Sequence, residues 1–170
     1  MTIDKTIQVN APAEKVWDVL GHQFHDAGMW ASSIEHSGPH EAGPVVGDAP
    51  FAQNGRACAT SLGPFRETIQ HYDEQTMRLG YTAEGDAMPF FVKRLENNWT
   101  VKPNGPNRST VVMEMEAKLL PVFAQVMGPL MKRQFDKVLT ETTDDLKHYL
   151  EHDQPSPRKV EADRRAKALA

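Results

Sequence analysis

The middle of the chain is a series of strand patterns, and this series limits the possible folds more than any other feature. Between Arg56 and Leu119, five segments with alternating apolar positions follow one another: "RACATSL", "PFRETIQHYD", "TMRLGYTAE", "FVKRLENNWTVKP" and "STVVMEMEAKL". The connections between them, including "LGP", "DEQ" and "PNGPNR", have the composition of turns. Successive strands joined in this way pair with one another, so the sequence predicts an antiparallel meander.

The hydrophobic period changes after residue 120. Side chains typical of a buried stripe then recur every three or four positions, at Phe123, Met127, Met131, Phe135, Val138, Thr142, Leu146 and Tyr149. This spacing predicts an amphipathic helix. Proline is tolerated in the first turn of a helix and disrupts later turns, so Pro129 predicts a short segment and then a long helix that starts near this residue.

The amino-terminal region predicts one strand and one helix. Residues 2–9 place Ile3, Ile7 and Val9 on one face, as in a half-buried strand. The segment "NAPAEKVWDVLG" follows, and Val16, Val19 and Leu20 form an apolar stripe along it. Its proline suits the first turn of a helix, and we expect the helix to stop at Gly21.

Three further segments carry weaker patterns. We expect a second short helix or turn over residues 22–30, a strand over 32–37, and a loop over the Gly- and Pro-rich residues 38–55. Residues 152–170, "HDQPSPRKVEADRRAKALA", have almost no apolar content and are expected to form a flexible polar tail. The domain is therefore expected to span residues 1–151.

The order of these elements predicts an α+β fold. A curved antiparallel sheet of about seven strands has one face to cover, and two short helices and one long carboxy-terminal helix are available to cover it. One helix cannot follow the sheet where it bends away. We therefore expect a gap between sheet and helix that can hold a ligand.

Composition excludes several classes of protein. Hydrophobic residues make up 39% of the chain and charged residues 25%, which is typical of a globular domain, and no apolar run is long enough to cross a membrane. The net charge of −4 argues against nucleic-acid binding, and the amino terminus lacks a signal-peptide pattern, so we expect a cytoplasmic protein. Phosphate-loop and dinucleotide glycine motifs are missing, and the seven histidines match no metal-site spacing. We therefore expect no cofactor and no metal, and the oligomeric state stays open.

A carboxylate in the meander needs an explanation. Side chains alternate along a strand, so Phe65, Glu67 and Ile69 share a face that should be buried. A buried carboxyl group requires polar partners, a changed protonation state, or a cavity that holds water or ligand. Glu67 could accept hydrogen bonds from Tyr81 or Asn97, or it could act as a general acid or base.

The order of motifs resembles the START/polyketide cyclase superfamily, whose fold is called helix-grip. The motifs that carry the resemblance are "APAEKVWDVLG" with Trp30, "GRACAT", "ETIQHYDEQTMRLGYT", "NNWTVKP", "TVVMEMEA" and "GPLMKRQFDKVLTETTDDLKHYLE". The chain looks most like bacterial stand-alone polyketide cyclase/dehydrase-type proteins and is more distantly similar to plant abscisic acid receptors. The resemblance to the receptors implies that Glu67, Glu114 and Tyr81 face the cavity. The receptors' gate sequence is missing from "TSLGPF", which argues against hormone reception.

Alternation and the resemblance together predict the ligand-binding residues. They are Cys58, Thr60, Phe65, Glu67, Ile69, His71, Tyr81, Leu95, Asn97, Trp99, Val112, Glu114, Met127, Met131 and Phe135. Most are apolar or aromatic, and a few are polar, which is the usual lining of a small-molecule site. The single cysteine, Cys58, is interpreted as a packing residue, with a reactive thiol as the alternative.

Three functions are compatible with this pattern. The first is binding of a small hydrophobic or aromatic molecule, such as a polyketide-, isoprenoid- or lipid-like compound. The second is a cyclase or dehydratase that uses Glu67 as its general acid or base. The third is a regulatory protein whose loop 38–55 closes on a ligand and then binds a partner.

Overall fold

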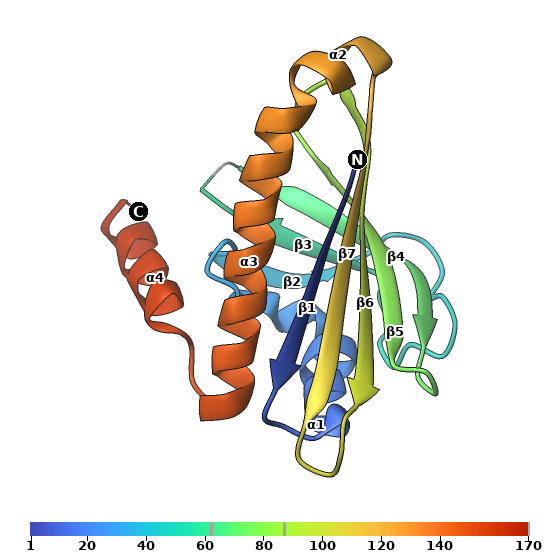
Figure 1. The fold of residues 1–170 in the computed structure, drawn as a ribbon, viewed down its shortest axis with the longest axis vertical. Helices are drawn as coiled ribbons and strands as arrows, with labels where there is room; N and C mark the ends of the chain where they lie inside the picture. The colour runs from blue at the N-terminus through green and yellow to red at the C-terminus, as the bar shows by residue number, and fades with distance from the viewer. Residues whose placement is uncertain (62, 87, 170) are drawn as a thin grey trace.

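A curved antiparallel sheet wraps around one long helix in the computed structural model, which describes residues 1–61, 63–86 and 88–169 (Figure 1). The strands are β1 (Thr2–Val9), β2 (His36–His40), β3 (Gly55–Ala59), β4 (Phe65–Asp73), β5 (Arg78–Gly85), β6 (Val92–Pro103) and β7 (Ser109–Leu119). The helices are α1 (Ala13–Trp17), η1 (Asp18–His22), η2 (Phe24–Met29), α2 (Pro121–Val126), α3 (Gly128–His152) and α4 (Pro157–Leu169). The predicted α+β helix-grip fold is confirmed. The predicted turn at Leu62 and the last tail residue, Ala170, lie outside the described residues.

The sheet order is β1-β7-β6-β5-β4-β3-β2, so strands β2 to β7 form the predicted meander and β1 adds to its far edge beside β7. Helix α3 packs along β1 and crosses the concave side of the sheet (Figure 1). It begins at Gly128 after the short helix α2, which confirms the break predicted from Pro129. None of the helices in the described part of the chain is long and apolar enough to cross a membrane.

The glycine at position 21 is needed for packing and does not stop the helix. Helix α1 continues into the π-helical turn η1, which passes through Gly21 and ends at His22. A Cβ atom at position 21 would lie 2.6 Å from the indole ring of Trp17. The expected stop signal is therefore wrong: glycine allows the buried indole to lie against the backbone of the next turn.

A bulge in β4 changes which side chains face the core. The register of β4 against β5 shifts between Ile69 and His71. Ile69 is buried, but the next buried side chain on the strand is Tyr72, and His71 is exposed. An extra residue in one strand reverses the alternation beyond it, so the prediction that His71 faces inward is wrong.

The second strand begins later than expected. Residues 32–35 precede β2, which covers His36–His40 and pairs with β3 in antiparallel register. The first residues of the segment expected to be loop, 38–55, are therefore strand. Ile34, the one apolar residue of "SSIEHS", packs in the core before the strand begins.

The polar tail contains a helix that is anchored to the domain. After α3 ends, α4 runs from Pro157 to Leu169, whereas the sequence predicted a flexible segment. Its anchor is polar: Lys159 is only 1% exposed, and its Nζ donates a hydrogen bond to the backbone oxygen of Ile34. Ser156 Oγ donates to Asp145 on α3, and Arg158 pairs with the same carboxylate. A search for apolar periodicity cannot detect such contacts, which explains the difference.

Candidate functional site

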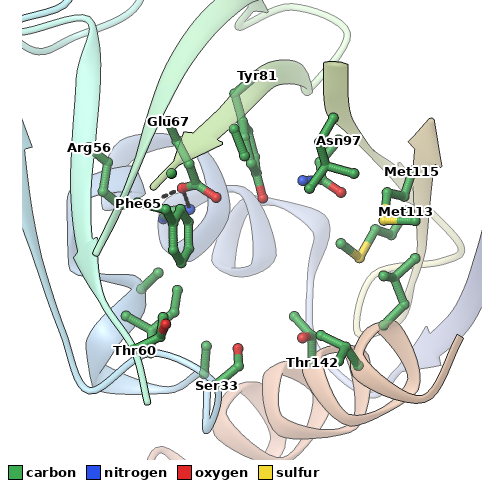
Figure 2. A pocket seen from close by; sticks show the side chains of 18 of the residues that line it. Ser33, Arg56, Thr60, Phe65, Glu67, Tyr81, Asn97, Met113, Met115 and Thr142 are labelled. Carbon is green, nitrogen blue, oxygen red and sulfur yellow. Dashed lines mark hydrogen bonds and ion pairs between the residues drawn. The ribbon is translucent and has the colours of Figure 1, made fainter. Parts of the chain in front are cut away.

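A cavity of about 470 Å³ lies between the concave side of the sheet and α3. Its walls are largely apolar, and they come from the helical segments after β1, from strands β3 to β7 and from α3. Figure 2 shows the polar groups among them: Arg56, Glu67, Tyr81 and Asn97 project from the sheet, and Ser33, Thr60 and Thr142 lie across from them. The lining residues Val138 and Pro89 are also exposed, so the cavity reaches the protein surface.

The central polar feature is a buried ion pair between Arg56 on β3 and Glu67 on β4. These residues are direct partners in the register of the two strands, and both are about 5% exposed or less. The guanidinium contacts Glu67 Oε2 through Nε at 2.6 Å and also through a terminal nitrogen. Burial raises the pKa of Glu67, and the neighbouring guanidinium opposes this effect. A buried carboxylate needs partners, and Arg56 is the main one.

Arg56 is itself held by several further contacts. Its terminal nitrogen donates to the backbone oxygen of Phe24, and its guanidinium lies 4.2 Å from the centre of the Phe24 ring and 5.6 Å from that of Tyr81. Aromatic faces attract cations, and this attraction is stronger away from water. The arginine is therefore fixed in position and permanently charged.

Cys58 supports the same carboxylate from the neighbouring strand. Its Sγ lies 3.9 Å from Glu67 Oε2, and the side chain is 3% exposed. Burial, together with the negative charge of Glu67, raises the pKa of the thiol to about 12. A thiol with this pKa stays protonated at neutral pH, so the geometry favours the packing interpretation over a reactive cysteine.

Three neighbouring strands present hydrogen-bonding groups to the cavity. Ion pairing and the thiol contact both use Glu67 Oε2, and within the described residues no hydrogen bond to Oε1 occurs. Tyr81 OH accepts a hydrogen bond from Trp99 Nε1 at 3.3 Å, which leaves the hydroxyl proton for another acceptor. Asn97 is the cross-strand partner of Tyr81 and also lines the cavity. We call Glu67, Tyr81 and Asn97 the polar wall (Figure 2).

A family model described as polyketide cyclase / dehydrase and lipid transport matches residues 1–151. The chain belongs to this family. The resemblance to the START/polyketide cyclase superfamily is thereby confirmed. The family match ends before α4, and no curated protein matches the sequence.

Solved structures share the fold of this family member at low sequence identity. An uncharacterised protein from Bacillus thuringiensis is 17% identical, with a TM-score of 0.68, and the match covers 88% of this chain and 98% of that chain. Norcoclaurine synthase from Thalictrum flavum, solved with dopamine and hydroxybenzaldehyde, is also 17% identical, with a TM-score of 0.62 and coverage of 89% and 87%. A START superfamily protein from Mycobacterium smegmatis is 16% identical, with a TM-score of 0.61, and the match covers 99% of both chains, a span that includes most of α4.

Just over half of the predicted ligand-binding residues line the cavity of this polyketide cyclase family member. The lining residues are Thr60, Phe65, Glu67, Tyr81, Leu95, Asn97, Trp99 and Phe135. Four others, Cys58, Ile69, Met127 and Met131, are buried or half-buried but do not form its surface. Contact of the lining residues with a ligand stays a prediction.

The inward direction predicted for Val112 and Glu114 is wrong. On β7 the buried side chains are Val111, Met113 and Met115, and Glu114 is exposed on the opposite face. The sequence contained this signal, because the positions that alternate with the two glutamates are all apolar: Val111, Met113, Met115 and Ala117.

The residue that sequence reasoning missed is Arg56. Alternation places it on the same face as Cys58 and Thr60, which were both predicted to point inward. The signal in the sequence was the charge of Arg56 on the inward face of one strand, followed by the inward Glu67 on the next strand. The sequence could not show that the two strands pair in the register that joins Arg56 to Glu67.

The loop that could have gated the cavity packs elsewhere. Within the described residues, no part of the segment 41–54 lines the cavity. Phe51 packs against Phe24 and His25, and Asn54 bonds to the backbone oxygen of Ile69. These contacts attach the loop to η2 and β4.

Proposed function

We propose that this protein binds a small, mainly apolar molecule in the cavity between the sheet and α3. The observation that carries the proposal is the cavity itself: apolar walls, with hydrogen-bonding groups concentrated on the polar wall. Ligand sites commonly combine an apolar lining with a few polar groups that fix orientation. The description of the family, which includes lipid transport, and the small aromatic compounds bound by norcoclaurine synthase are consistent with such a ligand.

The charges narrow the chemistry of the ligand. Arg56 and Glu67 neutralise each other, so the buried site offers no net charge to a charged ligand. Glu67 Oε1 is available to accept a hydrogen bond from a ligand, and the Tyr81 hydroxyl is available to donate one. A neutral hydroxyl- or carbonyl-bearing molecule of polyketide, isoprenoid or lipid type satisfies both groups.

Native mass spectrometry of freshly purified protein tests this proposal, together with binding of an environment-sensitive naphthalene dye. Val138→Trp places a large ring at an exposed position of the lining, and Val160→Trp makes the same change on α4, away from the cavity. We expect Val138→Trp to weaken dye binding roughly tenfold or more and Val160→Trp to leave it unchanged. Equal dye binding by all three proteins, with no co-purified ligand in any of them, contradicts the proposal.

A second candidate function is proton transfer of the cyclase or dehydratase type. The observation that favours it is the orientation of Glu67: one oxygen is held by Arg56, and the other points to the side of Tyr81 (Figure 2). Burial raises the pKa of this carboxyl toward the range in which it could exchange a proton near neutral pH. The Arg56 contact opposes this shift, which makes ligand binding the first choice.

Glu67→Gln separates the two functions. The variant keeps shape and hydrogen bonding and removes the base, so turnover of a candidate substrate should be lost while binding persists. Glu67→Gln leaves Arg56 as a buried charge without a partner, which destabilises the fold. The double variant Arg56→Gln/Glu67→Gln removes both charges and is the control for this loss of stability. Turnover that survives in both variants excludes Glu67 as the acid or base.

A further inference from the structure

One end of the molecule carries an exposed apolar surface that the fold does not explain. The tip of the β5–β6 connection and helix α2 with the start of α3 meet there, at the upper end of the molecule in Figure 1. We call this surface the apical patch, and it consists of Phe90, Val122, Phe123, Val126 and Leu130.

Four of the five patch residues are unusually exposed for their type, and Phe123 is half-buried. Phe90 is 71% exposed, Val122 72%, Val126 74% and Leu130 52%. None of the six residues of α2 is buried. Isolated exposed apolar side chains are common, but a cluster of this kind marks a surface that binds something.

Packing between the two segments makes the patch one surface. The Phe90 and Phe123 rings lie 5.2 Å apart, and Phe91 stacks on Phe123 at 4.8 Å. The backbone nitrogen of Leu120 donates to the oxygen of Phe91, which joins the connection to the end of β7. These contacts hold the β5–β6 connection and helix α2 together, so the exposed side chains of both segments form one surface.

Basic residues outnumber acidic residues around the patch, where the acidic residues are Asp86 in the β5–β6 connection and Glu96, the partner of Arg94. Residues 88–95 and 117–135 contain basic residues and no acidic residue, in a chain whose net charge is −4. The basic residues are Lys93, Arg94, Lys118, Lys132 and Arg133. All five are exposed, and Arg94 is paired with Glu96. The nearest acidic residue along α3, Asp136, is paired with Lys5.

We propose that the apical patch docks on the surface of a membrane that contains anionic lipids. Exposed apolar side chains enter the headgroup boundary of a bilayer, and a basic rim is attracted to anionic headgroups. A second copy of this chain would bring the two basic rims against each other, so the charge favours the lipid surface. The docking requires no assumption about the ligand in the cavity.

The position of the patch relates it to the cavity. Met88 and Pro89, which directly precede Phe90, line the cavity, and so does Phe135, two residues after Arg133 on α3. A membrane that contacts the apical patch therefore lies next to the end of the cavity formed by these residues. An apolar molecule could pass between bilayer and cavity there with little exposure to water.

Co-sedimentation of the full chain with vesicles tests the docking. Vesicles of phosphatidylglycerol and phosphatidylcholine in about equal parts are compared with pure phosphatidylcholine at low ionic strength. We expect binding to the anionic vesicles that weakens as salt is added, and little binding to the neutral ones. No binding to anionic vesicles, or equal binding to both kinds, overturns the proposal.

Matched variants locate the binding surface. Val126→Asp should weaken vesicle binding roughly tenfold or more, whereas Val160→Asp, at an exposed valine of α4, should not. Lys132→Glu/Arg133→Glu should have a similar effect, and Arg164→Glu/Arg165→Glu makes the same change in net charge elsewhere. Equal losses in patch and control variants overturn the proposal. A second copy of this chain is the other possible occupant. The proposal is also overturned if wild-type protein does not bind vesicles and instead forms a dimer in sedimentation velocity that Val126→Asp dissociates.

Discussion

Lys159 Nζ donates a 2.8 Å hydrogen bond to the backbone oxygen of Ile34, and this bond joins the last helix to the wall of the cavity. Ile34 and its neighbour Ser33 both line the cavity. On the other side of Ser33, the backbone nitrogen of Ser32 donates to Asp145 on α3. Segment 32–34 is thus held by polar contacts from α3 and α4, and residues beyond the family match help to shape the site.

Replacing Lys159 tests the strength of this anchor. Lys159→Met keeps most of the buried aliphatic chain and leaves the Ile34 carbonyl without its donor, so the free energy of unfolding should fall by about 1–3 kcal/mol. Lys167→Met, at an exposed position of the same helix, should change it by less than about 0.5 kcal/mol. Urea denaturation measures both. Equal stability of the two variants would show that the α4 anchor contributes nothing.

The contributions of Arg56 and Glu67 to the free energy of unfolding should be coupled. Arg56→Met leaves Glu67 as an unpaired buried charge and should cost about 3–5 kcal/mol of unfolding free energy. The double variant Arg56→Met/Glu67→Leu removes both charges and should recover a large part of that loss. A double-mutant cycle from urea denaturation measures the coupling, and additive losses would argue against it.

His22 and His25 should have pKa values that are shifted in opposite directions. Partial burial lowers the pKa of His22, but its hydrogen bonds with Glu74 and Asp18 outweigh this and raise the pKa above 6.5. Burial lowers the pKa of His25 below 6.5. Titration of the ring proton signals by NMR should give one midpoint on each side of this value. Coincident midpoints would contradict the assigned contacts.

The raised pKa of His22 also sets a pH dependence of stability. Because the folded state binds the proton more tightly, the stabilisation is fully present below pH 6.5 and is lost as the pH rises through the folded-state pKa. His22→Gln should therefore reduce stability at pH 5.5 more than at pH 8.5. The effect should stay within about 1 kcal/mol, because the contacts are partly exposed.

The thiol of Cys58 should be unreactive in the folded protein. With a pKa of about 12 and 3% exposure, it should not react with a disulfide reagent at pH 8 until the chain unfolds. Ala168→Cys introduces an exposed thiol and provides the positive control, which should react at once. Rapid modification of Cys58 in native protein would contradict the packing interpretation.

The sequence by itself determined the fold class. Alternating apolar positions specify strands, and a period of three to four specifies a helix, because each element must bury one face. The break before α3 followed from Pro129, because proline fixes its own φ angle and lacks a backbone N–H, and both effects act locally. The inward position of Glu67 also followed from local alternation. This alternation holds along β4 only as far as the bulge after Ile69, beyond which His71 is exposed.

Only the tertiary structure decided which residue Glu67 contacts. Its partner Arg56 lies on a different strand, and the pairing depends on a register that no local pattern encodes. The anchor of α4 has the same cause: Lys159 meets Ile34 across 125 positions of sequence, through a polar contact that leaves no apolar period. Local rules act within one strand or one turn, whereas the site and its supports are built from contacts between distant segments.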